Sequence, residues 1–245
     1  MDISHPRGTI ALVTGGYKHI GYTVSRELKG AGFEVVATYR TDAALAHKAA
    51  SSLGMAVRKA DMSREEDVCD LFSELEAEGK AVGVLVNNVS SFPRGPVLST
   101  SPSEMREAFE STYFASFYAI RMAVPRMKDR GYGRIINMGM AGLGELKGYT
   151  EVAVHASAKT ALSVLTLSLA RELSSTGITV NMVAPGVVDR PEWDDAAREA
   201  MRRRTRLHTI VPPEEVARAV AYLVSREDMN GRIIEVTGRF DPGKL

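Results

Sequence analysis

Residues 9–21 read Thr-Ile-Ala-Leu-Val-Thr-Gly-Gly-Tyr-Lys-His-Ile-Gly. The β-branched, apolar start of this stretch is typical of a buried strand, and the helical spacing from Ile20 to Gly30 predicts a helix behind it. Glycines between the two elements allow a tight turn, and the free backbone N–H groups at a helix N-terminus favour a phosphate. Because any tight connection of this kind uses glycine, the turn indicates an anion site only when other residues support it.

The alternation of short strand-like runs and longer helical stretches continues along the whole chain. Seven runs are predicted strands: Thr9–Val13, Glu34–Tyr39, Met55–Lys59, Val82–Val86, Arg134–Met138, Thr179–Val183 and Arg232–Val236. Six stretches are predicted helices: Ile20–Gly30, Asp42–Leu53, Arg64–Glu78, Ser103–Asp129, Val152–Ser175 and Pro213–Ser225. Strands joined by helices lie parallel with right-handed crossovers. We therefore expect a doubly wound, seven-stranded parallel α/β sheet of Rossmann type.

No linker-like segment interrupts this alternation, so we expect one domain over residues 1–245, with a substrate loop at about 187–212. The chain has 245 residues, of which 44% are hydrophobic and 25% charged, a balance that excludes extended disorder. Lys and Arg total 31 against 30 for Asp and Glu, so we expect neither nucleic acid nor a membrane surface as a partner. We find no export signal and no apolar run that would span a bilayer.

The chain contains one cysteine, Cys69. One cysteine forms neither an internal disulfide nor a cysteine-based zinc site, so we expect no metal centre. This cysteine content is typical of a reducing compartment and predicts a cytoplasmic protein.

Polar residues and turn formers follow several of the predicted strands. Asp61 follows the third strand, Asn87 the fourth and Pro185-Gly186 the sixth, while Lys159 lies in the long fifth helix. All are placed at the carboxyl edge of the sheet, where open α/β folds bind ligands. With the glycine turn, this combined order resembles the short-chain dehydrogenase/reductase family over nearly the whole chain.

The resemblance implies a Rossmann-type NAD(P) site. Gly15 and Gly21 would shape the pyrophosphate turn, Asp61 would meet the adenine, and Asn87 would brace the central strands. Lys159 would reach the nicotinamide ribose. The remaining expected coenzyme contacts are Lys18, His19, Ile20, Met62, Pro185, Gly186 and Val188.

The end of the second strand bears on which dinucleotide is used. An acid at this place would accept hydrogen bonds from a free ribose 2′-OH, but the strand ends in Tyr39-Arg40-Thr41. Arg40 and Lys18 form a pair suited to a 2′-phosphate, which predicts NADP(H). The alternative is that both cations are merely solvated.

The catalytic end departs from the family pattern at three places. His155 stands at the position of the family's Tyr, four residues before Lys159; Met140 stands at the position of its Ser, and Thr112 at that of its Asn. We expect His155, Lys159 and Thr112 to carry an altered proton relay. In addition, His19 replaces the middle glycine of the turn, and Arg190 replaces a usual Thr near the nicotinamide.

A neighbouring Lys⁺ lowers the pKa of an imidazole, so we expect His155 to be neutral, able to accept a proton from an alcohol but weak as a donor to a carbonyl. Met140 offers no hydrogen-bond donor. Two interpretations of His155 stay open: a catalytic base, or a structural residue beside the cofactor pocket. Tyr149, ten residues before Lys159, would replace the missing phenol only if its loop folded back.

The turn Thr14–Gly21 and the stretch Leu85–Phe92 also resemble the pteridine reductase branch of the family. In that branch the aromatic residue matching Phe92 stacks a flat ligand against the nicotinamide. The alternative for Phe92 is an apolar plug beneath its loop. We expect the substrate contacts to be Phe92, Met140 and Tyr149.

Three functional hypotheses follow. The first is an NADP(H)-binding oxidoreductase that acts on a small carbonyl, alcohol or C=N substrate. The second is a catalytically silent subunit that pairs with an active homologue, and the third is a non-redox dehydration or cyclisation on the same scaffold with His155 as base. The helical stretches Ser103–Asp129 and Val152–Ser175 resemble those that pair subunits in this family, which implies a dimer or tetramer, although packing within one chain also explains them.

Overall fold

A computed structural model describes residues 6–203, 205 and 208–237. Its strands are β1 (Thr9–Val13), β2 (Glu34–Tyr39), β3 (Ala56–Lys59), β4 (Ala81–Asn87), β5 (Gly133–Met138), β6 (Ile178–Pro185) and β7 (Ile233–Val236). All pair in parallel, in the order β3-β2-β1-β4-β5-β6-β7. The expected seven-stranded, doubly wound parallel sheet is confirmed. The strand order reverses between β1 and β4, which is where a crevice opens in folds of this kind.

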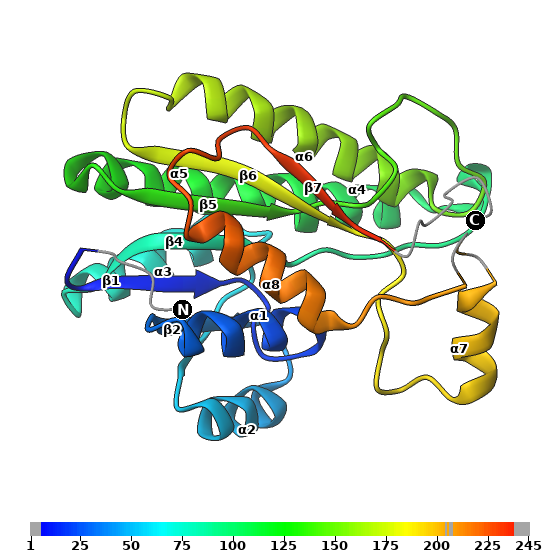
Figure 1. The fold of residues 1–245 in the computed structure, drawn as a ribbon, viewed down its shortest axis with the longest axis horizontal. Helices are drawn as coiled ribbons and strands as arrows, with labels where there is room; N and C mark the ends of the chain where they lie inside the picture. The colour runs from blue at the N-terminus through cyan, green and yellow to red at the C-terminus, as the bar shows by residue number, and fades with distance from the viewer. Residues whose placement is uncertain (1–5, 204, 206–207, 238–245) are drawn as a thin grey trace.

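Helices cover both faces of the sheet (Figure 1). They are α1 (His19–Gly30), α2 (Ala43–Leu53), α3 (Glu65–Ala77), α4 (Pro102–Phe109), α5 (Ala115–Arg130), α6 (Ala153–Glu172), α7 (Asp195–Arg202) and α8 (Pro213–Val224). The core on one face packs α1, α2 and α8 against the strands, and the core on the other packs α3, α5 and α6. Helices therefore cover both faces of the sheet, which explains why most of the strand residues are apolar.

The expected helix over residues 103–129 is interrupted. A π-helical turn, Glu110–Phe114, separates α4 from α5. The Ser111 hydroxyl donates to the Glu107 carbonyl at 2.7 Å and the Ser116 hydroxyl to the Thr112 carbonyl at 2.7 Å. Hydroxyl groups that bond back to carbonyls one turn earlier therefore accompany the interruption.

Helix α7 lies within the expected substrate loop at 187–212, of which residues 204 and 206–207 fall outside the described part of the chain. It buries none of its residues, although Ala196, Ala197, Ala200 and Met201 share one face of the helix by their spacing. Its N-cap Asp194 accepts a hydrogen bond from the Ala197 N–H at 2.7 Å. An aspartate at this position is a sequence signal for the start of a helix.

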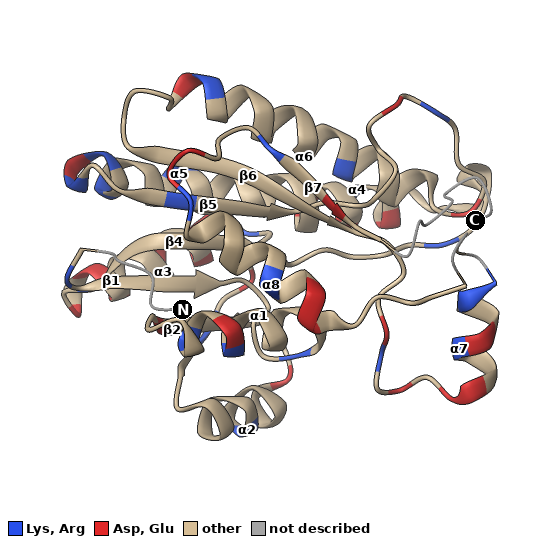
Figure 2. Ribbon diagram, in the orientation of Figure 1, with Lys and Arg blue, Asp and Glu red and all other residues tan. Residues whose placement is uncertain are grey.

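The expectation that no segment is long and apolar enough to span a bilayer is wrong for one helix of the described residues. By length and composition α6 qualifies, with a mean hydropathy of 1.2. Half of the apolar window is buried, and α6 packs against β6. The core helix of a folded domain meets the same criterion. Figure 2 shows basic and acidic positions mixed along the outer helices, in line with the nearly balanced charge.

Candidate active site

A cavity of about 500 Å³ opens at the carboxyl edge of the sheet. Turns after six strands contribute to its wall, because the carboxyl ends of parallel strands meet at one edge. Of the residues singled out from the sequence, those that line it are Gly15, Lys18, His19, Ile20, Gly21, Arg40, Asp61, Met62, Phe92, Met140, His155, Lys159, Pro185, Gly186, Val188 and Arg190. One crevice thus joins the expected coenzyme and catalytic ends.

The glycine turn brings backbone close to backbone. Gly15 has φ +63°, and its N–H donates to the Thr38 hydroxyl at 3.1 Å. A Cβ on Gly21 would lie 2.4 Å from the Gly15 carbonyl oxygen, so no side chain fits there. The turn ends at the N-terminus of α1, whose backbone N–H groups are available to a phosphate. This glycine cradle fits the pyrophosphate of a dinucleotide.

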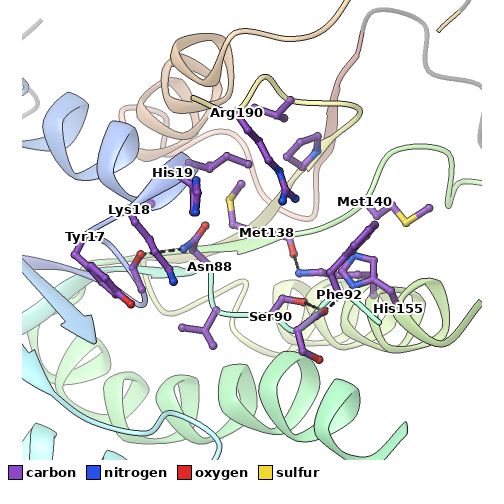
Figure 3. Close-up of a pocket in the computed structure, with 18 of the residues that line it drawn as sticks. Tyr17, Lys18, His19, Asn88, Ser90, Phe92, Met138, Met140, His155 and Arg190 are labelled. Atoms are coloured by element: carbon purple, nitrogen blue, oxygen red, sulfur yellow. Dashed lines mark hydrogen bonds between the residues drawn. The ribbon is translucent and has the colours of Figure 1, made fainter. Parts of the chain in front are cut away.

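His19 takes the middle position of this turn with φ +47°, a left-handed conformation that histidine tolerates better than most residues. Its Nδ1 lies 3.7 Å from a carboxylate oxygen of Glu192, in the loop before α7. Burial lowers the pKa of His19, and the nearby Arg190 and Lys18 add to this effect, while Glu192 opposes it. The turn and the loop after β6 therefore face each other across the crevice (Figure 3).

Asn87 does not line the cavity. Its side-chain amide donates to Asn137 Oδ1 at 2.8 Å, and the Asn137 amide donates to the Thr166 hydroxyl at 2.9 Å. Asn87 therefore ties β4 to β5 and α6 from within the core. The neighbouring Asn88 lines the cavity instead, and its amide donates to the Thr14 carbonyl at 2.9 Å, which holds the glycine turn.

At the expected adenosine end, Arg40 and Asp61 lie together. Arg40 Nη1 is 3.9 Å from Asp61 Oδ2, and Asp61 Oδ1 accepts hydrogen bonds from the Ser63 N–H and hydroxyl. Lys18 lies with its Nζ 5.3 Å from the centroid of the Tyr17 ring. Arg40 is about half exposed, so a ligand phosphate can compete for it.

Lys159 lies buried on α6 at the other end of the crevice. Its Nζ donates to the Met138 carbonyl at the end of β5, at 2.6 Å. Burial lowers the pKa of the Lys159 ammonium to about 7. Lys159 can therefore hold or release a proton near neutral pH.

His155 is buried one helical turn before Lys159. Its Nδ1 lies 3.0 Å from the Ser91 carbonyl oxygen, and because a carbonyl only accepts, Nδ1 carries the hydrogen. Burial and the Lys159 charge lower the pKa of His155 to about 3, although the hydrogen bond to Ser91 opposes them. The imidazole is therefore neutral, and its Nε2 presents a lone pair.

Thr112 does not line the cavity, because it is completely buried in the π-helical turn. Its hydroxyl lies 2.8 Å from the hydroxyl of Ser90, which does line the cavity and lies 3.0 Å from the Ser91 carbonyl oxygen. Any influence of Thr112 on a ligand passes through Ser90. In the sequence, Ser90 and Ser91 stand out as a pair of polar residues directly after the fourth predicted strand, which is where a ligand site is expected.

Tyr149 also lies away from the cavity. Its hydroxyl donates to the Gly142 carbonyl at 3.1 Å, and its ring packs against the small cluster of Met140, Val152 and Ala156. Burial raises the pKa of this phenol. Because its hydroxyl is used within the loop, Tyr149 does not take the place of the missing family Tyr here.

Phe92 and His155 contact each other at the substrate end, with ring centroids 4.4 Å apart and planes inclined by 70°. Figure 3 shows both rings beside Met140 and Ser90, with Arg190 pointing into the crevice from the opposite wall. The wall also includes Arg94, Glu107, Trp193 and Met201, which were not expected from the sequence. These four lie on loops or polar helices, whose path the strand pattern does not predict.

Comparisons with known proteins agree with this geometry. A family model described as enoyl-(acyl carrier protein) reductase matches residues 16–238. The acetoacetyl-CoA reductase of Shinella zoogloeoides is 31% identical over 224 residues, which cover 89% of this chain and 91% of the relative. The 2,3-dihydroxy-2,3-dihydro-p-cumate dehydrogenase of Pseudomonas putida is 30% identical over 246 residues, covering 94% and 93%.

The solved structures include a dehydrogenase/reductase from Sinorhizobium meliloti 1021, which superimposes with a TM-score of 0.84 at 31% identity. The match covers 97% of this chain and 96% of that one. The similarity therefore extends over the sheet, the crevice and the helices around it.

Proposed function

The chain belongs to the short-chain dehydrogenase/reductase family, and from this premise we propose that it is an NADP(H)-dependent oxidoreductase of a small carbonyl, alcohol or C=N substrate. The observation that carries the proposal is one continuous cavity, with a glycine cradle for a pyrophosphate at one end and His155 and Lys159 at the other. The relatives named above are a reductase and a dehydrogenase, which supports redox chemistry at this site.

The preference for NADP(H) is supported by the charges after β2. Arg40 and Lys18 both line the coenzyme end, and no acid ends β2 to accept hydrogen bonds from a ribose 2′-OH. The ion pair between Arg40 and Asp61 is long, at 3.9 Å, and partly exposed. A 2′-phosphate can therefore replace Asp61 as the partner of Arg40 at little cost in free energy.

The bound coenzyme would supply or accept the hydride. On the protein side, Nε2 of His155 accepts a hydrogen bond from the substrate, while Nδ1–H stays on the Ser91 carbonyl. Lys159 provides the ammonium group, which donates a proton or holds the coenzyme's ribose. Since Met140 donates nothing, a substrate that presents an O–H or N–H to His155 fits the site better than a bare carbonyl.

An oligomer is part of the proposal. Large apolar side chains are exposed on two neighbouring elements on one face of the sheet: Phe114 and Phe117 at and after the π-helical turn, and Val164 and Leu167 on α6. An apolar face of this kind is typical of a subunit interface. We propose a homodimer or homotetramer, with a hetero-oligomer as the alternative.

The test is a calorimetric titration of the purified protein with NADPH and with NADH, repeated for Arg40→Gln and Lys18→Gln. We expect NADPH to bind at least about tenfold more tightly than NADH, and each substitution to reduce this ratio by about tenfold, the cost of one charged hydrogen bond. The matched control is Arg218→Gln, which removes an exposed charge on α8, away from the cavity.

Equal affinity for NADH and NADPH would contradict the coenzyme choice, and the absence of binding would contradict the whole proposal. Tight binding without turnover of carbonyls, alcohols or imines would instead favour the silent subunit. That hypothesis is motivated by the neutral His155 and the donor-free Met140. In this case, activity gained by the double variant His155→Tyr with Met140→Ser would identify the missing groups.

A further inference from the structure

Two arginines of the substrate end have no carboxylate partner among the described residues. Arg94 lies with its Cζ 5.3 Å from the centroid of the Phe92 ring, and Arg190 with its Cζ 5.7 Å from that of Trp193. All four residues line the cavity. Each guanidinium group is therefore positioned by an aromatic ring, while its N–H groups stay available to a ligand.

The acids of the same wall do not neutralise these arginines. The Asp189 carboxylate accepts hydrogen bonds from Arg198 Nε at 3.0 Å and from the backbone N–H of Arg190 at 2.9 Å. Glu107 lines the cavity from α4, but within the described chain it forms no ion pair with either arginine. Within the described chain, both guanidinium groups therefore stay without a carboxylate partner.

The two arginines reach the cavity from different loops, Arg94 after β4 and Arg190 after β6. Arg94 and His155 both lie beside the Phe92 ring, since the Arg94 Cζ is 5.3 Å from its centroid and the Phe92 and His155 centroids are 4.4 Å apart with planes inclined by 70°. The first guanidinium and the imidazole therefore share one aromatic neighbour. Arg190 reaches into the crevice from the loop after β6, on the opposite wall (Figure 3).

We propose that Arg94 and Arg190 select a substrate that carries an anionic group, a carboxylate or a phosphate, about one ring away from the atom that reacts. The planar guanidinium group binds the two oxygens of such an anion at once. The ring of the substrate lies against Phe92 and presents its reacting group to His155. This inference rests on the proposed function and adds to it the class of substrate: small cyclic organic anions.

The experiment uses benzoate, phenyl phosphate and neutral benzamide as probes, with NADP⁺ saturating and without it. Affinities are measured by calorimetry. Emission of Trp193, the one tryptophan of the chain, shows whether a probe reaches the substrate end. We expect an anionic probe to bind about tenfold more tightly than benzamide, as one charge-assisted hydrogen bond predicts, and to change the Trp193 emission.

We expect Arg94→Gln and Arg190→Gln to remove this preference and Arg94→Lys to restore part of it, while Arg218→Gln leaves it unchanged. The affinities for benzoate and for phenyl phosphate show whether the site prefers a carboxylate or a phosphate. Equal affinity for benzamide, no anion binding, or a preference that survives both Gln variants would overturn the proposal. A failure of the coenzyme proposal is distinguishable, because it appears in the NADPH titration. The probe titrations without NADP⁺ still measure whether the two arginines bind an anion.

Discussion

At position 155 an imidazole is buried between a backbone carbonyl and a lysine. Nδ1 donates to Ser91, and the pKa of the ring is lowered to about 3, chiefly by burial. An imidazole four residues before a lysine predicts the direction of this shift from the sequence alone. The carbonyl that fixes the tautomer belongs to a residue 64 positions away, so the sequence could not predict which nitrogen faces the substrate.

The buried imidazole makes the stability of the fold depend on pH. The pKa of His155 is 6.5 in the unfolded chain and about 3 when folded, so between these values the unfolded chain binds the extra proton. The free energy of unfolding should therefore be highest above pH 6.5 and fall as the pH approaches 3, by up to about 1.4 kcal/mol per pH unit. Urea unfolding at several pH values measures it.

His155→Gln should flatten this dependence in that window, and the exposed His47→Gln is the matched control that leaves it intact. A slope that is the same in wild type and His155→Gln would mean that residue 155 is not buried as a neutral base.

At the scale of elements, the turn between β1 and α1 depends on the absence of a side chain. A Cβ at Gly21 would overlap the Gly15 carbonyl and lie 2.8 Å from the Asn88 amide. We expect Gly21→Ala to cost about 1–3 kcal/mol of unfolding free energy, the usual penalty of overpacking, and to lower NADPH affinity at least about tenfold. Thermal melts and calorimetry measure the two effects.

Gly30→Ala, at the other end of α1, is the control, because nothing lies within 4 Å of a Cβ there. It should leave NADPH affinity unchanged and stabilise the helix by about 0.5–1 kcal/mol. Unimpaired coenzyme binding by Gly21→Ala would show that the turn does not hold the pyrophosphate.

Most elements of the fold were predictable from the sequence, but α7 and the π-helical turn were not. The strands β1, β2, β4 and β6 carry buried apolar runs, whereas α7 is short and buries none of its residues. The turn explains why Thr112 misses the cavity although its position in the chain suggested a catalytic role. Its hydroxyl faces Ser90 inside the fold.

At the scale of the whole molecule, the parallel sheet itself gathers the site. Residues as distant as Lys18, Asp61 and Lys159 meet at one edge because each follows a strand or lies on a helix that starts there. The sequence therefore predicted many of the residues that line this cavity. It did not predict Arg94 or Trp193, since the loops that carry them have no periodic signal.

The central claim is that a dinucleotide lies with its pyrophosphate on the turn after β1 and its nicotinamide toward His155 and Lys159. A crystal structure of the protein grown with saturating NADP⁺ tests this most directly. We predict density for the pyrophosphate against the N-terminus of α1, the 2′-phosphate at Arg40 and Lys18, and the nicotinamide ring within contact of Lys159. A crevice without the dinucleotide, or one that holds it in the reverse direction, would contradict the account.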